Sequence, residues 1–223
     1  MKKTTTAFLL ICFATTTHAQ FFKGQPTTPI KKGTTLLGGS LQLNNNSTKV
    51  QNVITNNNTL QFNPQISCGV GTNKVRGINL YISNSKNVNG NVVDKNSGIG
   101  FGVFSRHYKS FHSLLYGIIQ SDISYHYYEY NRIGIVIPTN VSTNAVNINV
   151  QPGIAINISK NFQAEILFSN MIKFSYHNSV EKKPNISISP IRKNNLFLNG
   201  NLDPTKNISF GFRYLLQPKI KVG

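Results

Sequence analysis

Four charged residues occupy the polar faces of segments in which apolar and polar side chains alternate: Arg106, Asp122, Glu165 and Arg213. Pairing the segments that contain Glu165 and Arg213 as neighbouring strands would place the carboxylate beside the guanidinium. Arg106 and Asp122 lie on two other neighbouring segments, and we expect them to form a second ion pair. A buried charge without a partner is strongly destabilising, so an enclosed interior requires such pairing. We expect these residues to form a static polar core, and the alternative is an ion-pair gate.

Asp122, Ser124 and His126 supply the three side-chain types of a hydrolytic triad. They share one face of a single expected strand, on which residues two positions apart lie about 7 Å apart. A nucleophile and its general base must approach to about 3 Å. This geometry argues against catalysis, and we expect no catalytic residues and no enzyme activity.

The sequence also lacks a pattern for a metal or a cofactor. His107, His112 and His177 fall near the ends of expected strands or in loops, without the spacing of metal ligands. The chain has no glycine-rich phosphate loop of the nucleotide-binding type. We therefore expect no bound cofactor and no metal site.

Eight segments alternate with a period of two residues, which is typical of β-strands that have one apolar face. Short turns and long polar segments alternate between them, as in transmembrane β-barrels with an even number of strands. The expected strands cover residues 33–43, 59–70, 75–83, 98–108, 114–128, 146–158, 162–169 and 208–216. The expected long loops cover residues 44–58, 84–97, 129–145 and 175–205.

The polar faces of these segments decide between a soluble β protein and a membrane barrel. A surface in water normally carries about a quarter to a third charged residues. Among the polar-face residues, only the four named above are charged, and most others are Asn, Gln, Ser, Thr, Gly, His or Tyr. This composition favours an enclosed, hydrogen-bonded interior with the apolar faces turned to lipid. The expected fold class is therefore all-β, an eight-stranded antiparallel up-and-down transmembrane β-barrel.

The N-terminal residues have the pattern of a cleaved signal peptide. Lys2 and Lys3 precede a short apolar run, and a small-residue site allows cleavage between Ala19 and Gln20. The expected organisation is a signal peptide over 1–19, a periplasmic lead-in over 20–32, the barrel over 33–216 and a periplasmic tail over 217–223. Cleavage would leave Cys68 as the one cysteine, which excludes an intramolecular disulfide.

The chain is strongly basic, with a formal charge of +17 that falls to +15 without Lys2 and Lys3. Such basicity often indicates nucleic-acid binding, but an exported chain meets anionic membrane surfaces instead. We expect no nucleic-acid partner. The last long loop is a candidate site for anions such as lipopolysaccharide phosphates, and the alternative is a loop that its charges merely keep solvated. Its basic residues are Lys182, Lys183, Arg192 and Lys193.

Five short motifs follow one another along the chain: Gly33-Thr-Thr-Leu-Leu-Gly-Gly-Ser40, Phe62-Asn-Pro-Gln-Ile66, Gly102-Val-Phe-Ser-Arg-His-Tyr108, Gln151-Pro-Gly-Ile-Ala155 and Phe210-Gly-Phe-Arg-Tyr214. Over residues 33–216 the chain resembles small outer-membrane β-barrel domain proteins, similar in build to the OmpA membrane domain and to OmpX-like barrels. The resemblance implies an eight-stranded barrel in the cell outer membrane, with outer-membrane lipid and the barrel-assembly machinery as partners.

We expect an integral outer-membrane protein without catalytic activity that contributes to envelope structure or to surface interactions through its long basic and Asn-rich loops. One alternative is a small passive channel gated by the interior ion pairs. A second alternative is an outer-membrane enzyme, for which the sequence supplies few residues. We favour a monomer.

Overall fold

The computed structural model describes residues 30–50, 53–111, 114–134, 139–169, 171–182, 189–200 and 208–218. The expected signal peptide, its cleavage site at Ala19 and Gln20, most of the lead-in and the end of the tail lie outside these ranges. None of the described residues belongs to a helix that is long and apolar enough to cross a membrane.

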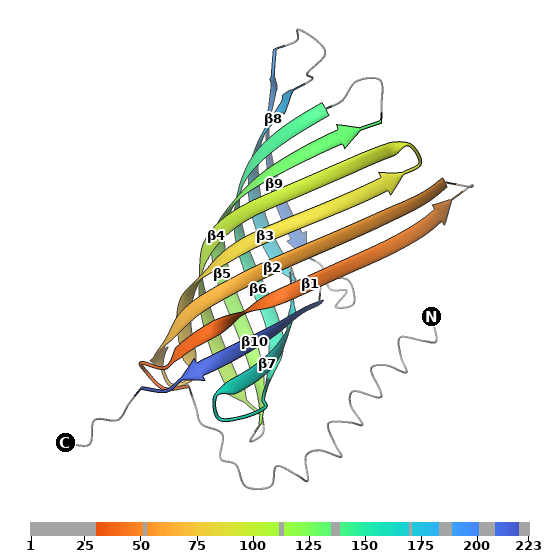
Figure 1. Cartoon of the computed structure of the whole chain (residues 1–223). Coiled ribbons are helices and arrows are strands. Elements are labelled where there is room, and N and C mark those ends of the chain that lie inside the picture. The colour runs from red at the N-terminus through yellow and green to blue at the C-terminus, as the bar shows by residue number, and fades with distance from the viewer. Residues whose placement is uncertain are drawn as a thin grey trace, which may run out of the picture.

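The described residues form ten strands in one antiparallel sheet whose strands are tilted around a common axis (Figure 1). The pairings run from β1 through each successive strand to β6, then to β7 and β10, and β10 pairs with β1. The sheet therefore closes on itself. The strands are β1 (Thr35–Val50), β2 (Val53–Gly71), β3 (Lys74–Asn89), β4 (Val92–Ser110), β5 (Leu115–Ile133), β6 (Thr139–Asn157), β7 (Phe162–Phe168), β8 (Ile172–Lys182), β9 (Ile191–Gly200) and β10 (Ile208–Leu216).

The strand count differs from the eight predicted from the sequence, because the segment expected to be the last long loop contains most of β8 and all of β9. β7 and β8 pair with successive parts of β6: Gly153–Asn157 pairs with β7, and Asn140–Val150 pairs with β8. β8 keeps the alternation of its neighbours, with Ile172, Phe174 and Tyr176 exposed. The prediction missed this continuation of the sheet beyond β7.

The other expected loops are also largely strand. The pairing of β3 with β4 continues from Asn84 opposite Ser97 to Asn89 opposite Val92, across the whole of the expected loop 84–97. Gly90 adopts a positive φ of 56° in the tight connection between these strands. Glycine takes this conformation readily, and the two-residue connection Gly90-Asn91 is of a kind that indicates a hairpin turn.

The outer face of the sheet is apolar. Large side chains such as Phe101 (61% exposed), Ile99 and Phe210 point away from the interior. In β2 the exposed apolar positions extend from Leu60 to Val70. This length is about 33 Å at about 3.3 Å per residue, which a tilt of about 40° reduces to about 25 Å, the height of the apolar band of membrane barrels. We call this ring of exposed apolar side chains the apolar belt.

The inside of the sheet, called the lumen below, is filled by two layers of different character. One end of the barrel carries the short turns that join β2 to β3 and β6 to β7. Near these short turns, an apolar cluster is buried, and it includes Ile30 of the expected lead-in. Ile30 is fixed there by a backbone bond from the Asn73 amide (2.8 Å). Most of the other buried side chains are polar or charged. The rest of the apolar cluster is Leu36, Val75, Phe104, Tyr108, Tyr116, Ile118, Ala155, Leu167 and Leu215.

Candidate functional site

Three charged side chains meet in the lumen and are each at most 2% exposed: Arg106 of β4, Glu165 of β7 and Arg213 of β10. Arg106 Nη1 lies 2.5 Å from Glu165 Oε2. Arg213 donates to Glu165 Oε1 from Nη2 at 2.8 Å and from Nε at 3.1 Å. One carboxylate therefore binds two guanidinium groups, and we call these three residues the ion cluster.

Neutral side chains hold the two arginines in place. Arg106 also donates to Gln120 Oε1 (3.0 Å from Nε) and to the Tyr108 hydroxyl (3.0 Å). Arg213 donates to Gln65 Oε1. These acceptors matter because a single carboxylate cannot satisfy the donors of two buried guanidinium groups.

Glycines on neighbouring strands leave space for the ion cluster. A Cβ atom on Gly211 would lie 2.6 Å from Glu165 Oε1, and one on Gly38 would lie 3.0 Å from Arg213 Cδ. Both glycines belong to strands that pair beside the cluster, since Gly211 is opposite Glu165 and Gly38 is opposite Arg213. The alternation of the sequence assigns these positions to the lumen. Because glycine has no side chain, the charged groups occupy the space that a larger residue would fill.

The predicted pair of Arg106 with Asp122 is wrong. In the pairing of β4 with β5, Arg106 is opposite Gln120 and Asp122 is opposite Phe104. Arg106 reaches across the lumen to Glu165, whereas neutral donors surround Asp122. Its Oδ1 accepts from the Tyr81 hydroxyl (3.2 Å) and Asn149 Nδ2 (3.1 Å), and its Oδ2 accepts from Gln151 Nε2 (3.2 Å).

Ser124 and His126 are closer than the strand geometry predicted. The Ser124 Oγ and His126 Nε2 atoms lie 2.9 Å apart, because the two side chains lean toward each other along β5. Asp122 does not complete a triad, since its carboxylate accepts from Tyr81, Asn149 and Gln151 instead. Within the described chain, the pair therefore lacks the carboxylate that would orient the histidine as a general base.

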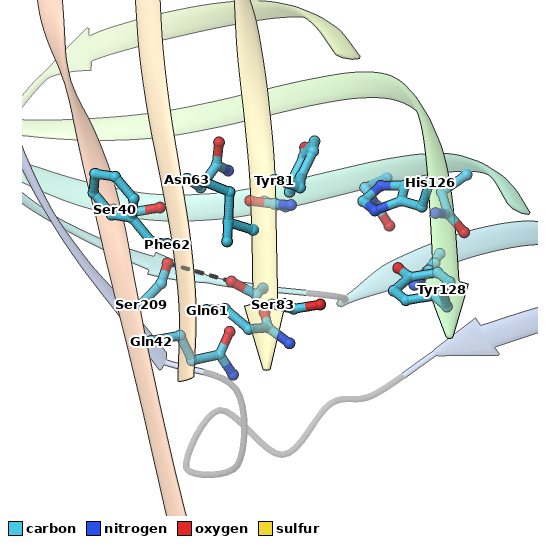
Figure 2. Close-up of a pocket in the computed structure, with 16 residues that line it drawn as sticks. Ser40, Gln42, Gln61, Phe62, Asn63, Tyr81, Ser83, His126, Tyr128 and Ser209 are labelled. Atoms are coloured by element: carbon cyan, nitrogen blue, oxygen red, sulfur yellow. Dashed lines mark hydrogen bonds between the residues drawn. The ribbon is translucent and has the colours of Figure 1, made fainter. Parts of the chain in front are cut away.

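A polar cavity of about 110 Å³ lies in the lumen on the far side of Asp122 from the ion cluster. Figure 2 shows Tyr81, His126 and Tyr128 along one side of it and Ser40, Gln42 and Ser209 along another. The ring of His126 stacks on Tyr128 (5.5 Å, 7°) and is tilted against Tyr81 (4.5 Å, 45°). The remaining walls are mainly amides and hydroxyls, together with Lys173 of β8.

The basic residues expected in the last long loop are divided between strands. Lys182 ends β8, and Arg192 and Lys193 lie in β9. Lys193 Nζ is 3.0 Å from Glu181 Oε2. Since successive residues of a strand face opposite sides, Arg192 and Lys193 do not form one patch. Lys183 lies outside the described residues.

The sequence did not predict the residues that line the polar cavity as site residues. Asn63, Asn147, Asn149 and Gln151 fell on the polar faces of expected strands without a role, and Lys173 fell outside all the expected strands. The continued alternation of Lys173, Ser175 and His177 with apolar neighbours was the signal that could have found Lys173. In the described ranges, no group of His, Cys, Asp and Glu side chains is arranged to hold a metal ion.

Comparison with known proteins gives weak likenesses of fold. No protein-family model matches the chain, and no curated protein matches its sequence. The translocator domain of the autotransporter NalP from Neisseria meningitidis aligns with a TM-score of 0.45 and 14% identity, over 96% of this chain and 79% of that one. A major outer membrane protein from Thermus thermophilus aligns with a TM-score of 0.49 and 8% identity, over 82% of this chain and 99% of that one. Both likenesses are of fold alone.

Proposed function

We propose that this protein is an integral β-barrel of the cell outer membrane, without catalytic activity, that contributes to envelope structure or to interactions at the cell surface. One observation carries the proposal: the large apolar side chains lie outside the closed sheet, whereas amides and charges are buried inside it. In water this arrangement would expose apolar surface and bury charges, both of which are unfavourable. In a bilayer, the same apolar belt contacts hydrocarbon.

The proposal includes an eight-stranded count for the barrel. β7 and β8 both pair with β6, and β9 and β10 pair with β8 and β7 respectively. We take β7 and β8 together as one interrupted crossing of the barrel, and β9 and β10 together as another. Eight crossings give a lumen just wide enough to be filled by its own side chains.

Export and insertion belong to the same proposal. Residues 1–19 would direct export and be removed, and the barrel-assembly machinery would insert the mature chain among outer-membrane lipids as a monomer. Arg192 and Lys182 are exposed near the end of the barrel opposite the short turns. They support an interaction with lipopolysaccharide phosphates, which guanidinium and ammonium groups bind through charge-assisted hydrogen bonds.

Cell fractionation with a heat-modifiability gel tests the proposal. The protein should be recovered in the outer-membrane fraction, and its unheated form should migrate differently from its boiled form in SDS. Recovery as a soluble periplasmic protein would reject the outer-membrane assignment.

A passive channel is the second candidate, and the packing of the lumen weighs against it. The apolar cluster fills the end near the short turns, and the ion cluster lies beside it. We expect no conductance from the purified protein in planar bilayers. Steady single-channel currents that Glu165→Ala alters would favour the channel instead.

A further inference from the structure

The polar cavity has hydrogen-bonding atoms that the described protein does not satisfy. Asn63 Oδ1, Asn147 Oδ1 and Asn149 Oδ1 are buried and have no hydrogen-bond partner among the described residues. Asn147 and Asn149 are only 1% and 5% exposed. All three residues line the cavity. Buried polar atoms are normally paired, so these three acceptors indicate that the cavity is built around hydrogen-bond donors.

Asp122 determines which end of the Asn149 amide is left unpaired. An ionised carboxylate only accepts hydrogen bonds. Asn149 must therefore turn its Nδ2 toward Asp122 Oδ1, at 3.1 Å, and its Oδ1 is left without a partner in the described chain. The unpaired acceptor is thus a consequence of the hydrogen bond that Asn149 donates to Asp122.

The charges of the lumen and its unpaired oxygens disfavour two classes of ligand. Arg106, Arg213 and Lys173 are positive, and Asp122 and Glu165 are negative, so these five residues give a net charge of +1 (three minus two). Lys173 lines the cavity itself and disfavours a cation there. The unpaired oxygens disfavour an anion, because they offer it acceptors rather than donors. A neutral ligand with several hydroxyl groups fits both conditions.

The size and the walls of the cavity limit this ligand further. The cavity, of about 110 Å³, has room for several water molecules, which suits a short polyol. Tyr81, His126 and Tyr128 provide ring surfaces against which C–H groups of a polyol can pack. The Ser40 and Ser83 hydroxyls add groups that can donate or accept.

We propose that the polar cavity is a binding site for a small neutral polyol, whose hydroxyl groups donate to Asn63, Asn147 and Asn149. The polyol lies among the rings of Tyr81, His126 and Tyr128. Asp122 acts as a positioning residue by orienting the Asn149 amide.

The test is an NMR titration of the whole chain folded in detergent micelles, with erythritol as the probe. The side-chain amide signals of Asn63, Asn147 and Asn149 should shift and saturate. Sodium acetate and ammonium chloride, titrated separately, should give no saturable shift. Saturable shifts with either salt, but not with erythritol, would show that the ligand is charged and would overturn the assignment of a neutral ligand. Shifts with erythritol that never saturate would show that the cavity holds only water and would overturn the site.

Two matched variants locate the binding. Asn147→Leu removes an unpaired acceptor and fills part of the cavity, so it should weaken erythritol binding at least tenfold. Asn96→Leu is the control, since Asn96 also has a buried unpaired Oδ1 in the described chain but does not line the cavity; its affinity should stay within twofold. If Asn147→Leu does not fold, Asn63→Leu replaces it. Equal affinities in the cavity and control variants would overturn the location.

Discussion

At the residue scale, the ion cluster is the feature most sensitive to a single substitution. Glu165 accepts from both Arg106 and Arg213 in a fully buried position. The prediction that Glu165 lies beside Arg213 was correct, because their two strands are neighbours in the sheet. The sequence could not place Arg106 beside them, because that contact crosses the lumen and depends on how the whole sheet closes.

Replacing Glu165 by alanine should strongly destabilise the folded protein. The change leaves two guanidinium groups buried without a carboxylate, which costs about 3–5 kcal/mol. The free energy of unfolding in guanidinium chloride, measured for protein folded in lipid vesicles, checks this. Glu129→Ala is the control, since Glu129 is exposed and accepts a hydrogen bond from the neutral Tyr127 hydroxyl. Equal losses in the two variants would contradict the role given to the ion cluster.

The ion pair of Asp94 with Arg132 lies beyond the apolar belt and predicts a pH effect. Hydrogen bonds from Arg132 (2.8 Å to Oδ1) hold the pKa of the Asp94 carboxyl below its usual value. A carboxyl whose pKa is lowered by folding contributes stability above its usual pKa and loses it as the pH falls through the lowered one. This contribution should therefore disappear only in acid, below about pH 4.

A carboxyl-carbon NMR titration of Asp94 measures this pKa directly. In Arg132→Gln, the midpoint should move up toward the usual value, because the donor guanidinium is gone. An unchanged midpoint in Arg132→Gln would show that the pair does not form in solution.

At the scale of the elements, the alternation of the sequence identified the part of each strand with an apolar outer face better than its ends. Apolar outward residues such as Ile78, Leu80 and Ile82 alternate with lumen residues in the expected way. The strands then continue into Asn- and Ser-rich sequence, which has low β propensity. Those extensions exist because they pair across tight turns, as Lys86 does with Lys95. Such pairing is a property of two strands and is not visible in the pattern of one.

The apolar belt should tolerate a charge at its edge but not at its middle. Phe101 lies midway in the exposed apolar run of β4, whereas Ser97 lies outward beyond it. Phe101→Arg should lower stability in lipid vesicles by about 2–4 kcal/mol, as expected for arginine at the bilayer midplane, and Ser97→Arg by about 1 kcal/mol or less. Equilibrium folding into vesicles measures both. Similar values for the two variants would mean that the belt does not contact hydrocarbon.

At the scale of the whole molecule, a closed sheet separates two environments. Its outer face is apolar, over a height of about 25 Å in β2, and its lumen changes from the apolar cluster through the ion cluster to the polar cavity. The all-β antiparallel class and the apolar outer face were predicted from the alternation of the segments and from the scarcity of charges on their polar faces. The polar cavity was not predicted, because its walls come from strands distant in the sequence, from Ser40 in β1 to Ser209 in β10.

The depth of β4 in a bilayer tests the inside-out arrangement most directly. Spin labels on single cysteines at residues 95, 101 and 109, in a Cys68→Ser background without residues 1–19, would report collisions with oxygen and with a water-soluble nickel complex. Oxygen should dominate at position 101, and the nickel complex should dominate at positions 95 and 109, where lysines are exposed in the native chain. Equal access of the nickel complex at all three positions would contradict the outer-membrane barrel.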